Sequence, residues 1–154
     1  AYYCAYYSIR ANAFDYEKMA MGRERLEYYI NDYKAKKADG TISNVEDDEL
    51  KDMRIVQEMY ARGFEFVPID IYKAKARSFQ IIDGKIMPSF KVISKVGESA
   101  GESIEIAARD GEFLSKDDLR QRAKIGQTVI EKLGELGLLD GMAESNQLSL
   151  FDVI

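Results

Sequence analysis

The side chains that could carry chemistry in this chain are carboxylates and amines, because its 154 residues include no histidine. Without histidine there is no Ser-His-Asp triad, no Cys-His nucleophile and none of the usual zinc sites. The single cysteine, Cys4, stands among tyrosines and is interpreted as a small packing residue rather than a reactive thiol. The sequence therefore predicts carboxylate chemistry, lysine chemistry, or no chemistry at all.

Two acidic clusters could supply catalytic carboxylates. Residues 47–49 read Asp-Asp-Glu, and residues 117–118 read Asp-Asp. Each cluster falls early in an expected helix, where a negative charge is favoured by the partial positive charge of the helix N-terminus. We therefore interpret both clusters as dipole partners, and we predict no catalytic residue and no metal ligand in this chain.

A glycine turn that occurs twice is more informative. Residues 95–99 read Lys-Val-Gly-Glu-Ser and residues 124–128 read Lys-Ile-Gly-Gln-Thr, each before an expected helix. Such a turn leaves the first amides of the helix unpaired, and the helix dipole adds partial positive charge, so that a phosphate oxygen can bind there. Two such hairpins could hold two phosphates of one DNA backbone without reading its sequence.

Some charges in the sequence oppose phosphate binding and others favour it. Glu98, Glu102 and Glu105 lie in and just after the first turn, where they would repel a phosphate, so two ordinary helix–turn–helix connections are the open alternative. The chain as a whole carries a net charge of −5. Residues 73–95, however, hold six basic residues against a single aspartate. A basic surface is therefore expected to be local.

The end of the chain is an apolar peptide that follows a polar stretch. It consists of Gln147, Leu148, Ser149, Leu150 and Phe151. An extended peptide of this kind can insert alternate side chains into an apolar groove of another protein, while the glutamine amide makes directional hydrogen bonds. A terminal strand or helical turn that docks on its own domain is the alternative.

The elements that must position these residues are mainly helical. Helical spacing of apolar residues runs from Phe14 to about residue 37, with an interruption near Gly22. Ser43 and Glu46 have the spacing of a capping box, which predicts a second helix to about residue 62.

A small β element is expected in the middle of the chain. Residues 64–71 alternate in polarity and predict a strand, and residues 78–82 predict another. Asp83 and Gly84 then form a hairpin turn before a third short strand at residues 85–87. The predicted fold class is mainly α with a small β hairpin, built around a tandem helix-hairpin-helix DNA-binding module.

Composition is that of an ordinary globular protein, with 46% apolar and 32% charged residues. No apolar run approaches the roughly 20 residues that a membrane-spanning helix needs. No signal peptide opens the chain, which begins with Ala1. We therefore expect no membrane, a cytoplasmic location and a piece of a longer protein.

These motifs together resemble the C-terminal region of the PolC-type DNA polymerase III alpha chain of bacteria. Residues 147–151 resemble the bacterial sliding-clamp-binding motif, and they follow tandem hairpins as in that family. Further stretches in the same order along the chain are similar to the family: Tyr-Tyr-Ser-Ile-Arg-Ala at 6–11, Arg-Gly-Phe-Glu-Phe at 62–66, Asp-Ile-Tyr-Lys at 70–73, Met-Pro-Ser-Phe at 87–90 and Gly-Glu-Phe-Leu-Ser-Lys-Asp-Asp-Leu at 111–119.

The resemblance implies three parts: the end of the fingers region at residues 1–71, a duplex-binding module at 72–141 and a clamp-binding tail at 142–154. It implies a parent chain that is a DNA-directed DNA polymerase with magnesium in its palm domain. This piece lacks the palm, so it should need no cofactor and be inactive alone. The implied partners are the backbone of double-stranded DNA, the bacterial sliding clamp and the rest of the polymerase chain.

The resemblance also assigns residues to the two binding surfaces. In the family, glycine is common at the position of Lys95 and alanine at that of Gly101. Gln147 would orient the clamp peptide, and Leu148, Leu150 and Phe151 would be its buried anchors. The residues expected to contact DNA, the last three being looser candidates, are Lys95, Val96, Gly97, Ser99, Lys124, Gly126, Gln127, Thr128, Lys73, Lys75 and Arg77.

The alternative function is a free-standing adaptor that carries helix-hairpin-helix units but has no polymerase activity. Such an adaptor would bind DNA, or would use the hairpins to bind only protein. Salt-dependent DNA binding by the chain would separate the DNA-binding interpretation from a protein-interaction module.

Overall fold

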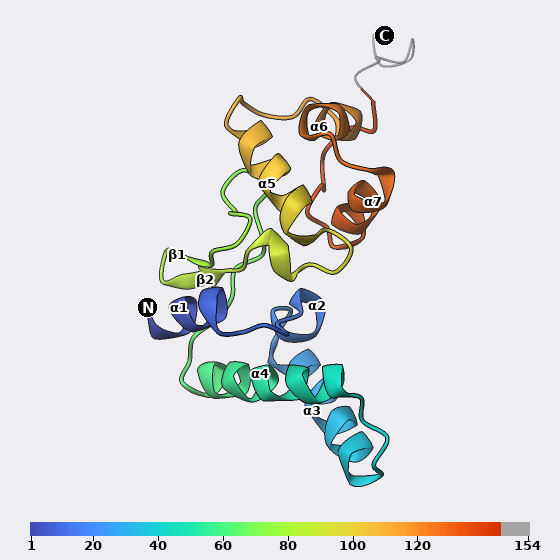
Figure 1. The fold of residues 1–154 in the computed structure, drawn as a ribbon. Coiled ribbons are helices and arrows are strands. Elements are labelled where there is room, and N and C mark those ends of the chain that lie inside the picture. Colours follow the sequence, from blue (N-terminus) through green and yellow to red (C-terminus); the bar gives the residue numbers. More distant parts are fainter. Residues whose placement is uncertain (146–154) are drawn as a thin grey trace.

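The computed structural model describes residues 1–145, which form helices and a small β hairpin at one side of the molecule (Figure 1). The first half of the chain forms α1 (Tyr2–Ile9), α2 (Tyr16–Met19), α3 (Arg23–Ala38) and α4 (Asn44–Ala61). The second half forms the strands β1 (Gln80–Ile82) and β2 (Lys85–Met87), the 3-10 turn η1 (Phe90–Val92), α5 (Gly97–Ala108), α6 (Lys116–Ala123) and α7 (Gln127–Glu135). The predicted fold class, mainly α with a small β hairpin, is confirmed.

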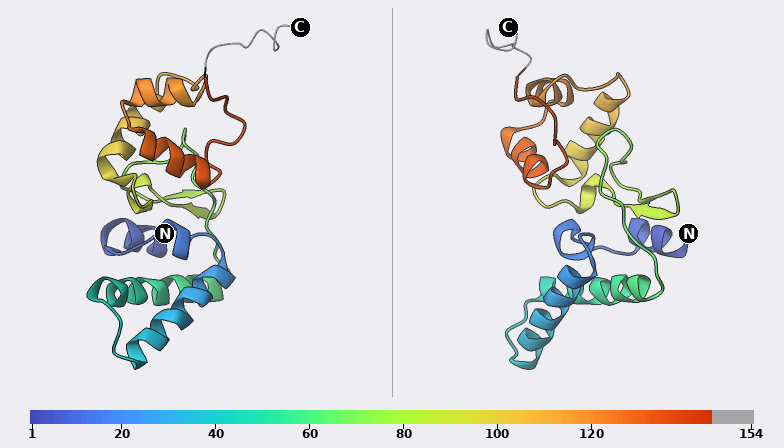
Figure 2. Two further views of the ribbon diagram at one scale, coloured as in Figure 1. Left: turned by 90° about the vertical axis from the view of Figure 1, so that its right-hand side faces the viewer. Right: turned by 180° about the vertical axis from the view of Figure 1, so that it is seen from behind.

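The helix α4 begins where its cap predicts. The Ser43 hydroxyl accepts the N–H of Glu46 at 3.1 Å, and the Glu46 carboxylate accepts the N–H of Ser43 at 3.0 Å. This capping box satisfies two donors that the helix leaves unpaired. Gly63 follows the end of α4 with a φ of +85°, a left-handed conformation that glycine adopts without strain. The pair α3 and α4 lies at the end of the molecule opposite α5–α7 (Figures 1 and 2).

The hairpin of β1 and β2 is also as predicted. The strands are antiparallel, with Ile82 paired to Lys85 next to the turn. Asp83 and Gly84 have φ values of +50° and +78°. Positive φ at both central residues is the requirement of a tight two-residue hairpin turn, which Asp-Gly satisfies.

The strand predicted at residues 64–71 is wrong. Within the part of the chain that the structure describes, this segment makes a single parallel bridge, between Phe66 and Ile86. The N–H of Val67 donates to the Ile86 carbonyl at 2.9 Å. The next ladder bonds would need an N–H on Pro88, which has none, and the N–H of Ile69, which donates to the Tyr16 hydroxyl at 3.3 Å instead. The alternating polarity of residues 64–71 therefore reflects an extended connection that buries one of its sides, and not a strand of a sheet.

One hydrophobic core joins the two halves of the chain. The rings of Tyr7 and Phe14 lie 5.5 and 5.1 Å from the ring of Phe79 between centroids. Farther along the chain, the buried Lys132 of α7 forms an ion pair with Glu17 of α2. The core is therefore continuous across residue 71, and the division of the chain at that residue stays a prediction.

The helix α5 packs against η1 at a contact that favours glycine. Gly101 is buried in the middle of α5, and a Cβ built on it would lie 2.6 Å from the Cβ of Phe90. Real Cβ atoms do not approach this closely, so alanine would force the two elements apart. The glycine costs helix propensity of about 1 kcal/mol, and the close approach of η1 explains why it stands there.

Candidate nucleic-acid interface

The turn that precedes α5 is built from two residues with left-handed backbone. Lys95 and Gly97 have φ values of +70° and +72°, and Val96 between them is buried. The N–H groups of Val96 and Gly97 both donate to the carbonyl of Ile93, at 3.2 and 3.4 Å. A lysine thus occupies a conformation that favours glycine. The turn itself uses the N–H groups of Val96 and Gly97, two of the residues expected to contact DNA.

The next two amides of this turn are available. Within residues 1–145, the N–H groups of Glu98 and Ser99 donate to no acceptor. They lie in the first turn of α5, where an α-helix leaves its amides unpaired. Because α5 is 12 residues long, these amides also lie at the positive end of a helix dipole.

The turn between α6 and α7 repeats this arrangement. Lys124 ends α6 in the left-handed conformation, with a φ of +53° and a ψ of +45°. Ile125 is buried, and its N–H donates to the Arg120 carbonyl at 3.2 Å. Gly126 precedes α7 with an extended φ of −79°. In the described part of the chain, no acceptor takes the N–H groups of Gln127 or Thr128 (residues 127–128).

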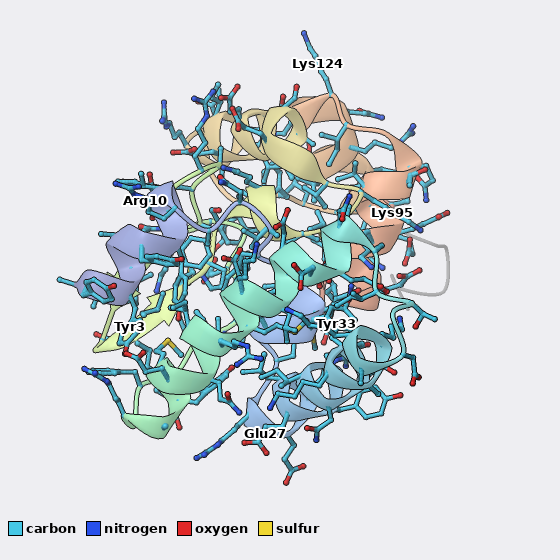
Figure 3. All side chains as sticks on the ribbon, turned by 60° about the horizontal axis from the view of Figure 1, so that its bottom comes forward. Tyr3, Arg10, Glu27, Tyr33, Lys95 and Lys124 are labelled. Carbon is cyan, nitrogen blue, oxygen red and sulfur yellow. The ribbon has the colours of Figure 1, made fainter. Side chains whose placement is uncertain are left out.

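The two turns present similar groups to solvent. Lys95 and Lys124 are both exposed, and neither forms an ion pair with any residue up to position 145. Lys124 extends clear of the ribbon, and Lys95 also lies at the surface (Figure 3). Figures 1 and 2 show both turns on the side of the α5–α7 unit that faces away from β1 and β2. Within residues 1–145, each turn therefore combines one amine that has no ion pair with at least two amides that have no acceptor.

The three looser basic candidates differ in their surroundings. Lys73 and Lys75 are exposed and have no ion-pair partner in the region that the structure describes. Arg77, in contrast, lies 2.6 Å from a carboxylate oxygen of Glu98 and 2.7 Å from one of Glu102. The sequence could not show this pairing, because it depends on how the segment before β1 folds onto α5.

Sequence reasoning missed Arg122, which fixes the connection between the two hairpins. Its guanidinium donates to the carbonyls of Ala107 at 2.8 Å, Gly111 at 3.2 Å and Glu112 at 3.0 Å. It also lies over the ring of Phe113, 4.6 Å from the centroid. Five donors in one planar group suit Arg122 to this task. The spacing from Asp118 could have indicated an ion pair, but not the carbonyl contacts.

The chain leaves the hairpin unit at the N-terminus of α6. The carbonyl of Ala143 accepts the N–H of Lys116 at 2.8 Å, and that of Glu144 accepts the N–H of Asp117 at 3.2 Å. The Lys116 amine also pairs with the Glu144 carboxylate at 2.7 Å. The residues predicted to bind the clamp, Gln147, Leu148, Leu150 and Phe151, lie outside the described residues.

Both acidic clusters have structural partners. Asp118 accepts the N–H of Leu114 at 2.9 Å beside the start of α6. Asp47 and Asp48 lie early in α4, where they pair with Lys37 and Lys51. These contacts agree with the interpretation of the clusters as charges at helix N-termini.

Several titratable groups in the first half of the chain have clearly shifted pKa values. Burial raises the pKa of Asp52, although its carboxylate accepts the N–H of Ala13 at 2.9 Å. Burial and a hydrogen bond to Glu49 raise the pKa of Tyr33 to about 12. Each shift follows from packing and a named partner. Among residues 1–145, no three His, Cys, Asp or Glu side chains gather to hold a metal ion, and no helix is long and apolar enough to cross a membrane.

Comparison with known proteins gives a consistent result. Residues 63–148 match the family model described as a helix-hairpin-helix motif. The proteins named DNA polymerase III PolC-type of Streptococcus suis (strain 98HAH33) and Streptococcus pyogenes serotype M2 are each 43% identical over 151 residues, 98% of this chain. That of Streptococcus pneumoniae serotype 2 is 42% identical over 151 residues. In each case the chain spans 10% of the relative's length.

Proposed function

The chain belongs to the helix-hairpin-helix family, and on this basis we propose that it holds the backbone of duplex DNA for a bacterial replicative polymerase. The repeated turn carries the proposal. In each copy a lysine in the left-handed conformation is followed by at least two amides, at the positive end of a helix, that have no acceptor within residues 1–145. Both the lysine amine and the amides can bind a phosphate oxygen, and neither group distinguishes one base from another.

The parent protein in this proposal is a DNA-directed DNA polymerase of the PolC type, as its relatives are named. Residues 1–71 belong to its fingers region, residues 72–141 hold the duplex and residues 142–154 are the tail. Magnesium and the catalytic carboxylates belong to the palm of that longer chain. The piece described here binds and positions DNA in the cytoplasm but catalyses nothing by itself.

The exposed surface of helix α1 favours contact with a further partner, the rest of the polymerase chain. It contains no charged residue, and Tyr2 and Ile9 on it are 68% and 74% exposed. Phe64 and Ile81, which line a cavity together with Tyr2, extend this apolar surface. A helix that is apolar on all sides is normally buried, so we expect other parts of the polymerase to cover it.

The tail completes the proposal. The bacterial sliding clamp would bind Gln147, Leu148, Leu150 and Phe151 as an extended peptide. Because residues 143–144 are bonded to the start of α6, a clamp held by the tail would stay close to the hairpins. Tethering raises the effective concentration of DNA near a weak binding site, so that the hairpins rebind DNA before the complex separates.

The test is binding of the chain to DNA duplexes of unrelated sequence at several salt concentrations. We expect weak binding of similar affinity for all sequences. The logarithm of the binding constant should fall linearly with that of the salt concentration, with a slope of about −0.9 for each phosphate contacted. No binding, or binding that ignores salt, would instead favour the alternative in which the hairpins contact only protein.

A further inference from the structure

The first hairpin carries a carboxylate next to its free amides. Glu98 follows Gly97 directly, and its own N–H donates to no acceptor within residues 1–145. The second hairpin has the neutral Gln127 at the equivalent place. A free carboxylate at the positive end of α5 would be attracted to the amides that a phosphate needs. The two hairpins thus differ by one charge at this position.

Arg77 holds this carboxylate. A single nitrogen of its guanidinium, Nη2, lies 2.6 Å from Glu98 Oε1 and 2.7 Å from Glu102 Oε1. The two glutamates are one helical turn apart on α5, so one guanidinium reaches both. One positive charge therefore faces two negative charges beside the first hairpin.

The backbone around Arg77 is fixed from two sides. The N–H of Ala76 donates to the carboxylate of Glu105 on α5 at 3.0 Å. On the other side, the N–H groups of Phe90 and Lys91 donate to the carbonyls of Lys75 and Ala76, each at 3.0 Å. Residues 75–77 are thus bonded to both elements that flank the first turn, and this places the guanidinium of Arg77 beside Glu98.

We propose that Arg77 is a positioning residue for phosphate binding at the first hairpin. It holds the carboxylate of Glu98 away from the free amides of Glu98 and Ser99, and it does not contact the phosphate itself. The inference rests on the proposed DNA binding. An arginine suits the task because its planar group, with several donors, can bind two carboxylates at once.

A double-mutant cycle on DNA affinity tests the proposal. Arg77→Ala is measured alone and in combination with Glu98→Gln, which gives the first hairpin the residue type of the second. We expect Arg77→Ala to weaken duplex binding about fivefold in the native background and less than about twofold when Glu98→Gln is present. The loss should shrink because no carboxylate is left to compete for the amides.

Lys75→Ala is the matched control, because Lys75 is a neighbouring exposed cation without an ion pair in the described region. It should weaken binding by the same factor in both backgrounds, as a charge that acts independently does. An Arg77→Ala loss that is equal or larger in the Glu98→Gln background would overturn the proposal. Arg77 would then act as a phosphate contact or only through net charge.

Two further observations keep the outcomes distinct. Exposed ion pairs contribute little to folding, so Arg77→Ala should unfold thermally within a few degrees of the native chain. Arg77→Gln, which keeps more of the side chain, is the second variant if alanine perturbs the fold. If the native chain binds no duplex, the proposed function fails. If it binds but Arg77 and Glu98 are uncoupled, only this inference fails.

Discussion

Phe90→Ala is expected to destabilise the chain by about 3–5 kcal/mol, the range for removing a large buried aromatic ring. Phe90 is 0% exposed, and its Cβ lies against Gly101 of α5. Alanine keeps this Cβ and also keeps the N–H that donates to the Lys75 carbonyl at 3.0 Å. The variant therefore removes ring packing alone, at the joint between η1 and α5.

Denaturant unfolding followed by circular dichroism measures this loss. Leu114→Ala is the control, because Leu114 is 74% exposed and its truncation should change the free energy of unfolding by no more than about 0.5 kcal/mol. If Phe90→Ala were as mild as Leu114→Ala, the ring would not be part of the core, and the described packing of the first hairpin would be incorrect.

Leu150→Ala combined with Phe151→Ala is expected to abolish binding of the chain to a bacterial sliding clamp. Both residues are proposed anchors of the tail, and truncating two buried apolar anchors commonly costs several kcal/mol. The native chain should bind the clamp with micromolar or better affinity, about −8 kcal/mol. Loss of binding by about 100-fold or more in the double variant is the expected result.

Asp152→Asn serves as the control for the tail, since it changes a neighbouring residue outside the proposed peptide. This variant should bind the clamp with an affinity within about twofold of that of the native chain. A native chain that does not bind the clamp, or that binds equally well without both anchors, would show that the tail serves its own domain. The polymerase interpretation would then rest on the relatives alone.

Features set by neighbouring residues could be predicted from the sequence. The capping box of Ser43 and Glu46 and the turn of Asp83 and Gly84 form as expected, because each depends on residues no more than three positions apart. The strand at residues 64–71 was predicted wrongly. A strand needs a partner to pair with, and the period of polarity says nothing about whether one is present.

Contacts between distant segments could not be predicted. The pairing of Arg77 with Glu98 and Glu102 follows only from the folding of residues 75–77 against α5. Gly101 stands at a position where alanine is common in the family that the sequence resembles, and its place opposite Phe90 gives it a packing role. The element before the first turn is a single 3-10 turn, η1, and apolar spacing does not distinguish so short an element from a helix.

The most direct test of the account is the salt dependence of duplex binding by Lys95→Ala/Lys124→Ala. If the two hairpins each hold a phosphate, this variant should bind more weakly to every sequence, and its slope against salt should fall by about 2. Arg25→Ala/Lys34→Ala removes two exposed charges from α3, at the far end of the molecule (Figure 1), and should leave the slope nearly unchanged. If both double variants changed the salt slope equally, or if Lys95→Ala/Lys124→Ala left it unchanged, binding of the DNA backbone by the hairpins would be contradicted.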